Sequence, residues 1–114
     1  MYKTKDSGKR VKFTSGFQRD TNDEKPRYDL IPHECLTRLA EIYARGAKKY
    51  NDDNWRLANS EPEYKRFKES AYRHFIQWFR GDEDEDHASA VVFNIFAFEW
   101  HDKKNNLKKR RSKS

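Results

Sequence analysis

The sequence lacks several features that would define its class directly. It has one cysteine, Cys35, so an internal disulfide is excluded, and this predicts a reducing compartment such as the cytoplasm. No apolar run approaches the roughly 20 residues that a membrane span needs, and none follows the basic N-terminus, so we expect neither an anchor nor a signal peptide. A glycine-rich phosphate loop, an HExxH motif and a CxxC motif are also missing.

Aromatic residues stand out in what is present. Only 34% of the 114 residues are hydrophobic and 39% are charged, but 15% are Phe, Trp or Tyr. Because a few large rings can form a small core, this composition argues against a wholly disordered chain and predicts one small domain.

Charge divides the chain into three parts. Residues 1–12 have a net charge of +4 and residues 103–114 have seven basic residues and no acidic one, whereas residues 13–102 have a net charge of −5. We therefore predict a flexible basic arm over 1–19, a helical domain over 20–102 and a basic tail over 103–114. The acidic body favours a cation site, and the basic ends favour phosphate-rich partners.

Helical periodicity predicts an all-α fold of three or four helices. Apolar residues at spacings of three and four indicate helices over about 32–49, 63–80 and 84–102, with Gly81 as a C-terminal cap, and no strand alternation is present. The helix over 84–102 is apolar on almost every side, which is typical of a helix that is buried all round. Three short helices can hardly enclose it, so we expect a homo-oligomer.

Polar residues interrupt the apolar faces of the second and third predicted helices. His74 lies about 20° from Phe67 around the helix axis, and His87 and Asn94 share one face of the next helix. Taken alone, His74 could be an ordinary core histidine, and Asn94 could make a structural hydrogen bond. Together they require partners, because burying them unpaired costs a few kcal/mol. The partners could be one another, a metal or a ligand.

Acidic residues near this seam predict a divalent cation. The run from Asp82 to Asp86 could simply favour a helix dipole, but five clustered carboxylates repel without a cation, and carboxylate and amide oxygens suit Mg²⁺ or Mn²⁺. The metal-ligand candidates are Asp82, Asp84, Asp86 and His87, with Glu34 of second rank. The candidates for catalytic roles are Glu85, Asp86, His74 and Glu41.

Basic and aromatic residues could bind a nucleotide, although each is also an ordinary surface or loop residue. The candidates for phosphate are Lys25, Arg27, Lys49 and Arg73, and those for the nucleoside are Tyr28, Tyr50, Asn54, Trp55 and Asn94.

The order of these motifs resembles that of a known family. The string Lys25-Pro-Arg-Tyr-Asp-Leu-Ile-Pro32 is followed by Gly46-Ala-Lys-Lys-Tyr50, Asn54-Trp55, Arg73-His74, Gly81-Asp82, Glu85-Asp-His87 and Asn94. Over about residues 16–100, the chain resembles small, mostly phage-encoded dATP/dGTP diphosphohydrolases, which are related to the all-α MazG-like nucleotide pyrophosphohydrolases.

The resemblance implies an oligomeric helical bundle in the host cytoplasm that binds a purine deoxynucleoside triphosphate with Mg²⁺ or Mn²⁺. Water would attack the α-phosphorus and release the monophosphate and pyrophosphate. The broader superfamily holds metal on an ExxE pattern in one helix and ExxD in the next. Here Glu83 to Asp86 fits ExxD, but the helix over 63–80 has no ExxE, and His74 lies where a ligand is wanted.

The alternative is a non-enzymatic nucleic-acid-binding or host-interaction protein that uses its basic ends. Seven cations in a tail would make binding strongly salt-dependent. The tail has no aromatic residue on which bases could stack. We therefore favour the hydrolase.

Overall fold

The computed structural model describes residues 10–20 and 25–107. The chain divides into two compact units, residues 1–31 and 32–114, which are described separately. Residues 1–9, 21–24 and 108–114 lie outside the described part, so the expected arm is covered only over residues 10–19 and the expected tail only over residues 103–107.

The first unit contains a small hairpin. Strand β1 (Arg10–Lys12) pairs antiparallel with β2 (Gln18–Asp20), and the turn between them includes Gly16 at a φ of +92°. The rings of Phe13 and Phe17 lie 5.5 Å apart beside the turn. No alternation of apolar and polar residues marks this hairpin in the sequence. Strands of three residues are too short to give the alternation that sequence patterns detect, and the turn sets the pairing instead.

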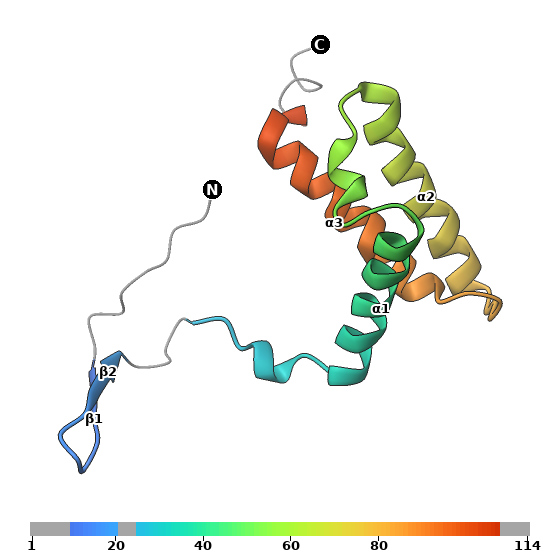
Figure 1. Ribbon diagram of the computed structural model, residues 1–114. Helices are drawn as coiled ribbons and strands as arrows, with labels where there is room; N and C mark the ends of the chain where they lie inside the picture. Colours follow the sequence, from blue (N-terminus) through green and yellow to red (C-terminus); the bar gives the residue numbers. More distant parts are fainter. Residues whose placement is uncertain (1–9, 21–24, 108–114) are drawn as a thin grey trace. The chain divides into compact units, whose positions relative to one another are not determined.

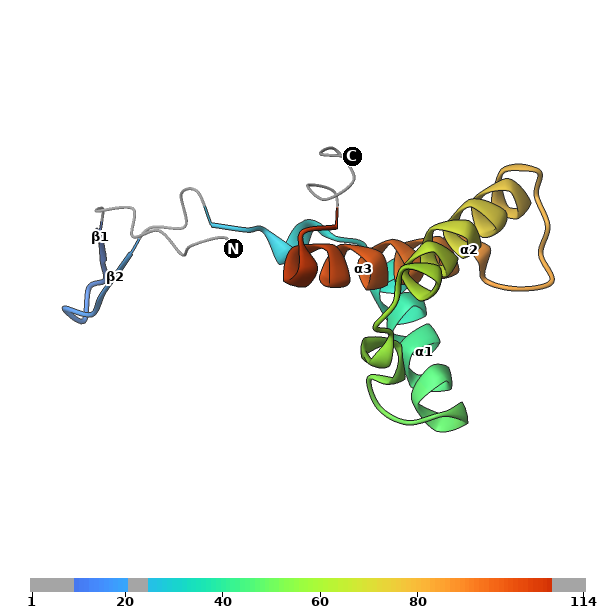
Figure 2. The same ribbon diagram turned by 90° about the horizontal axis from the view of Figure 1, so that it is seen from above.

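A short 3-10 helix, η1 (Tyr28–Leu30), ends the first unit, and the second unit is helical. Its elements are α1 (His33–Lys49), the 3-10 helix η2 (Asn54–Leu57), α2 (Glu61–Phe79) and α3 (His87–Asn105). Helix α3 packs against α1, α2 and η2, as Figures 1 and 2 show. The predicted all-α bundle is confirmed.

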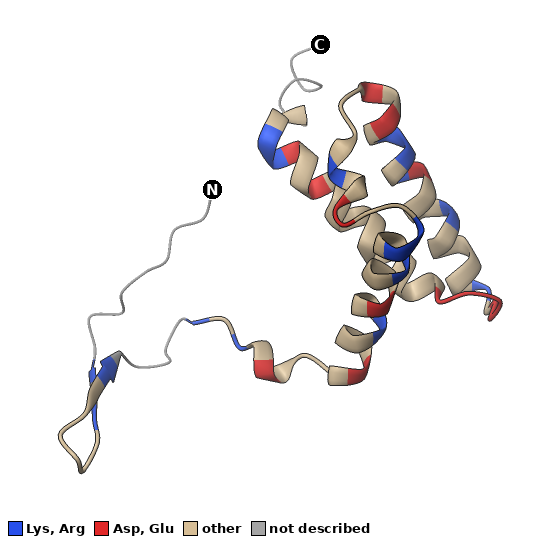
Figure 3. Ribbon diagram, in the orientation of Figure 1, with Lys and Arg blue, Asp and Glu red and all other residues tan. Residues whose placement is uncertain are grey.

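The turn between α2 and α3 follows the predicted capping, with one shift. Gly81 takes a φ of +90° directly after the α2 terminus, a conformation that favours glycine. Helix α3 begins at His87, three residues later than expected, because the Asp86 side chain accepts a hydrogen bond from the Ser89 N–H at 3.2 Å and acts as the N-cap. The acidic run therefore lies in the turn (Figure 3).

The core of the second unit is small. Tyr64, Phe98 and Leu107 form its buried cluster. Beside it His101 is buried among the rings of Trp55, Tyr64, Phe67 and Trp100. The His101 Nε2–H donates a hydrogen bond to the Trp55 carbonyl at 3.0 Å, which ties η2 to α3.

Much of the expected apolar stripe is exposed. Helix α3 is not buried all round, since Ile95 and Phe96 are 45% and 52% exposed, and the expected core residues Phe75 and Trp78 of α2 are also exposed. Within one chain, the helices therefore leave one side of α2 and one side of α3 exposed. Oligomerisation stays a prediction. In the described part of the chain, no helix combines the length and apolarity of a membrane span.

We predict that His101→Phe lowers the free energy of unfolding by about 1–3 kcal/mol, because the ring volume is kept but the buried Trp55 carbonyl loses its donor. Urea unfolding followed by circular dichroism measures this. The same substitution at exposed His33 is the matched control and should stay within about 0.5 kcal/mol of wild type. Equal effects at the two sites would contradict the role given to His101.

Candidate functional site

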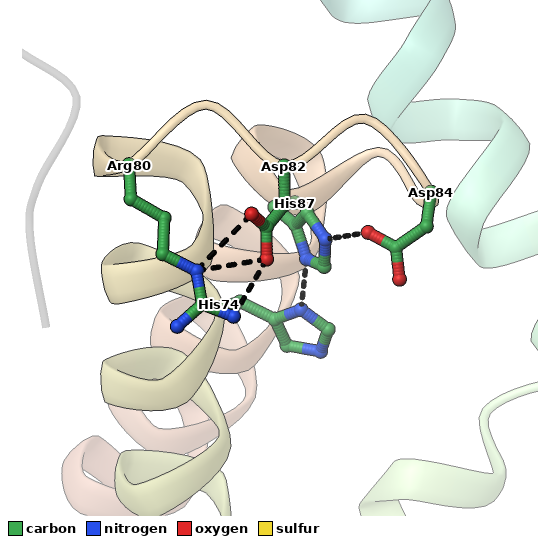
Figure 4. A network of polar contacts seen from close by, with 5 residues as sticks. All are labelled: His74, Arg80, Asp82, Asp84 and His87. Carbon is green, nitrogen blue, oxygen red and sulfur yellow. Dashed lines mark hydrogen bonds and ion pairs between the residues drawn. The ribbon is translucent and has the colours of Figure 1, made fainter.

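Two carboxylates and an imidazole gather at the turn between α2 and α3. Asp82, Asp84 and His87 each present a possible ligand atom, and these atoms lie within 4.8 Å of one another. Figure 4 shows the carboxylates on the turn above the His87 ring, which comes from the first residue of α3. His87 is only 2% exposed, whereas Asp84 is exposed. The cluster is therefore anchored on a buried ring and open to solvent at its carboxylates.

Both ring nitrogens of His87 have partners. Its Nε2 lies 2.8 Å from Asp84 Oδ1, and its Nδ1 lies 2.8 Å from Nδ1 of His74 on α2. The hydrogen bond from His87 holds the pKa of Asp84 below its usual value. Burial lowers the pKa of His74, and the neighbouring positive charge of Arg73 lowers it further. The predicted meeting of His74 with His87 across the helix seam is thus present.

Asp82 is paired with Arg80, the C-cap residue of α2. The Arg80 Nη2 donates to Asp82 Oδ2 at 2.8 Å, and its Nε lies 3.0–3.1 Å from both carboxylate oxygens. This pairing lowers the pKa of Asp82. A guanidinium therefore stands beside the cluster, where it can also meet an anion.

Asp86 faces a different direction. It accepts two hydrogen bonds from Arg38 of α1, at 2.6 and 3.0 Å, in addition to capping α3. The guanidinium holds the pKa of Asp86 well below its usual range. Asp86 thereby joins α1 to α3, and its predicted metal or catalytic role stays a prediction.

The remaining predicted acids and Asn94 do not belong to the group of Asp82, Asp84 and His87. Glu85 is exposed on the same turn, and its charge acts on His74. Glu34 lies in the first turn of α1, and Glu41 is exposed on α1, where its charge acts on Arg38. The Asn94 side chain donates to the Ala90 carbonyl at 2.8 Å within its own helix.

A second feature of this unit is an open pocket of about 830 Å³, within the size range of small-molecule sites. It lies between the second half of α1, η2, the start of α2 and Phe93 of α3, and none of the cluster residues lines it. Three of its lining residues, Tyr50, Asn54 and Trp55, are predicted nucleoside contacts.

The predicted phosphate contacts are distributed over both units. Lys49 and Arg73 are exposed on α1 and α2. Lys25 and Arg27 belong to the first unit, as does the predicted nucleoside contact Tyr28, and Arg27 is paired with Asp29 at 2.7 Å. The roles of all five stay predictions.

Two site residues escaped sequence reasoning. Arg38 lies 48 positions from Asp86, so no local pattern reveals the contact. Arg80 and Asp82 flank Gly81 in the sequence. This spacing indicates an ion pair only once the conformation of the turn is known.

The chemistry of the cluster fits a divalent cation. Carboxylate oxygens suit Mg²⁺ and Mn²⁺, and an imidazole nitrogen suits first-row transition metals. Asp82, Asp84 and His87 offer both kinds of donor at one point, and they come from a turn fixed by helices on each side. Such a group can bind an ion that in turn meets phosphate oxygens.

The fold and the cluster together define a small all-α protein with a carboxylate–imidazole group between two helices. A family model described as dATP/dGTP diphosphohydrolase, N-terminal, matches residues 15–111. The chain belongs to this family, whose description is that of a diphosphohydrolase. No curated protein and no solved structure matches the chain.

We predict that Asp86→Asn lowers the free energy of unfolding at pH 7 by about 1 kcal/mol, since a partly exposed bidentate pair is lost while Asn still caps the helix. Because the folded pKa of Asp86 is depressed, its charge stabilises fully above the unfolded value of about 4, and this contribution is lost as the pH falls below it. The difference from wild type should therefore narrow at pH 3.

Urea unfolding at pH 7 and pH 3 measures this effect. The matched variant Arg38→Gln removes the same ion pair and should show the same pH dependence, with little further loss in the double variant. A difference between Asp86→Asn and wild type that is the same at both pH values would contradict the assignment.

Proposed function

We propose that this protein hydrolyses purine deoxynucleoside triphosphates, dGTP and dATP, to the monophosphate and pyrophosphate with the help of a divalent cation. One observation supports this above all: a chain of the diphosphohydrolase family brings Asp82, Asp84 and His87 together at a solvent-accessible turn. Two carboxylates repel a triphosphate unless a cation lies between them. The cluster would therefore meet the substrate through a bound cation.

The cation would be held by Asp82, Asp84 and His87. Of the two candidates, Mn²⁺ suits the group better than Mg²⁺, because one of the three donors is an imidazole nitrogen. When bound, such an ion neutralises phosphate charge and polarises the attacking water. Glu85, exposed on the same turn, is placed better than Glu41 to accept a proton from that water. Asp86, a first-rank candidate from the sequence, is ranked lower here because it pairs with Arg38, and Glu34 remains of second rank.

The nucleoside would occupy the open pocket. Tyr50 and Trp55 offer aromatic faces for a base, and Asn54 offers hydrogen bonds. The other polar lining includes three acids, Asp52, Asp53 and Glu63, which can accept hydrogen bonds from the exocyclic amino group of a purine, and one base, Arg66. Because the acids outnumber the base, this lining favours the purine in the pocket and the phosphates outside it.

The pocket and the cluster lie along one helix seam. Phe67 lines the pocket, and His74, seven residues further along α2, faces nearly the same direction and contacts His87. Seven residues correspond to a rise of about 10 Å. A nucleotide with its base in the pocket can therefore extend its phosphates toward the cluster. There Arg73 would neutralise charge, with Arg80 a further candidate, and Lys49 could do so at the pocket end, where it lies over the Tyr50 ring.

The predicted oligomer has a matching surface on α2. Tyr72, Phe75, Ile76 and Phe79 recur at helical spacing and are exposed, on the side of α2 away from His74. Contiguous apolar surfaces of this kind are typical of protein interfaces. A second copy of this chain would bury the stripe against its own about a two-fold axis.

To test the activity, we predict that wild type with Mn²⁺ converts dGTP or dATP to monophosphate and pyrophosphate, separated by ion-exchange chromatography. Asp84→Asn should lower kcat/KM by about 100-fold or more, since even outer-shell partners of a metal are worth about 10–100-fold. Its matched control is Glu69→Gln, on an exposed residue of α2 outside the cluster, which should retain the rate. Diphosphate as the product, or full activity of Asp84→Asn, would contradict the proposal.

To test the oligomer, we predict that wild type is a dimer or larger and that Phe79→Asp is a monomer, by light scattering after size exclusion. Phe79 is 76% exposed in the single chain, so the change should leave the helical spectrum intact. Leu30→Asp, also on an exposed apolar residue but in the first unit, is the control and should not change the mass. A monomeric wild type would refute the interface.

A further inference from the structure

His74 has an unusual partner: the ring of another histidine. The two Nδ1 atoms of His74 and His87 lie 2.8 Å apart, with the rings tilted by 39°. His74 is partly buried on α2, and His87 is buried at the start of α3. The three ligand atoms that lie close together belong to Asp82, Asp84 and His87 and include none from His74. A role for His74 in holding a cation at this group would therefore act through His87.

Hydrogen-bond chemistry determines where the hydrogens lie in the series of side chains His74, His87 and Asp84. A bond between two ring nitrogens needs one N–H and one lone pair. The ionised Asp84 can only accept, so Nε2 of His87 carries a hydrogen and donates it. A neutral His87 then has its lone pair on Nδ1, and His74 must donate from its own Nδ1. Without a cation the hydrogen bonds thus run from His74 to His87 to Asp84.

A cation bound to His87 would reverse this direction. His87 Nε2 and Asp84 Oδ1 now lie 2.8 Å apart and share one hydrogen. An ion held by both residues would take the place of that hydrogen, and the exposed Asp84 carboxylate would turn off the axis of the Nε2–H bond. A neutral His87 that ligates through Nε2 carries its hydrogen on Nδ1, so it must donate to Nδ1 of His74.

We propose that His74 is the positioning residue of the metal centre: its Nδ1 accepts a hydrogen bond from the metal-bound His87 and orients that ring, and His74 does not itself bind the metal. Metal-ligating histidines commonly need such an acceptor on the second ring nitrogen. The two imidazoles stay neutral, because the hydrogen that leaves Nε2 of His87 is balanced by one on Nε2 of His74. This inference rests on the cation site of the proposed function.

The view in Figure 4 agrees with this role. The His74 ring lies below His87 with one nitrogen turned to it, and the second nitrogen is on the side of the ring away from His87. The Asp82 and Asp84 side chains come from the turn and lie on either flank of the His87 ring, whereas His74 lies below the ring. His74 therefore supports the ring from a side that neither carboxylate takes.

Two substitutions of similar polarity separate the possibilities. The amide oxygen of His74→Asn lies near the position of Nδ1 and can accept from His87, whereas the amide of His74→Gln reaches the position of Nε2 and cannot. With Mn²⁺ titrated into the protein and the free ion read by electron paramagnetic resonance, His74→Gln should bind about 10–100-fold more weakly than wild type. His74→Asn should bind close to wild type. Circular dichroism checks that both variants remain helical.

A second measurement reads the hydrogen directly. In the ¹⁵N-histidine-labelled protein, long-range NMR correlations should show His87 protonated on Nε2 without metal. After saturation with Zn²⁺, a diamagnetic ion that also accepts imidazole, His87 should be protonated on Nδ1. His74 should change at the same time from protonation on Nδ1 to protonation on Nε2, a change that a merely structural His74 would not make.

Each outcome decides the matter. Equal Mn²⁺ affinities for wild type and both variants, an equal loss in both, no Mn²⁺ binding by wild type, or His87 unchanged by Zn²⁺ would overturn the inference. Hydrolysis of dGTP or dATP is measured separately on wild type. If wild type does not hydrolyse either nucleotide but the variants differ in Mn²⁺ affinity as expected, the proposed function is refuted and the positioning role is kept. If wild type releases pyrophosphate but the Mn²⁺ affinities are equal, the proposed function is kept and the positioning role is refuted.

Discussion

The burial of the His87 ring is the constraint on which the site depends. A buried imidazole needs a partner on each nitrogen, since an unpaired polar group in such surroundings costs a few kcal/mol. One partner, His74, comes from α2, and the other, Asp84, comes from the turn. The end of α2, the turn and the start of α3 are therefore held in one arrangement, and Gly81 at positive φ lets the chain reverse tightly enough to permit it.

Three alternate carboxylates of the turn each have a different hydrogen-bond partner. Arg80 and Arg38 place positive charge beside Asp82 and Asp86, and His87 donates a hydrogen bond to Asp84, so the mutual repulsion of the three carboxylates is reduced without a cation. Two of these three also lie within reach of a shared ion. The turn can thus fold in the absence of metal and still accept one, which is a useful property for a site in the dATP/dGTP diphosphohydrolase family.

Periodicity predicted the parts of this arrangement that local sequence controls. The three helices and the Gly81 cap follow from spacing and capping, and the meeting of His74 with His87 follows from polar residues on apolar faces. Periodicity could not reveal the pairing of Arg38 with Asp86, which spans 48 positions. It also could not show that Asn94 turns to its own helix backbone, because a helix face does not determine which way an amide bonds.

The central claim is that the turn between α2 and α3 holds a divalent cation on two carboxylates and the outward nitrogen of a buried histidine. Anomalous diffraction from crystals grown with Mn²⁺ tests it most directly. The account predicts a manganese peak within about 2.0–2.3 Å of Asp82, Asp84 and Nε2 of His87. A manganese peak elsewhere on the protein, with this group still joined by its own hydrogen bonds, would contradict it.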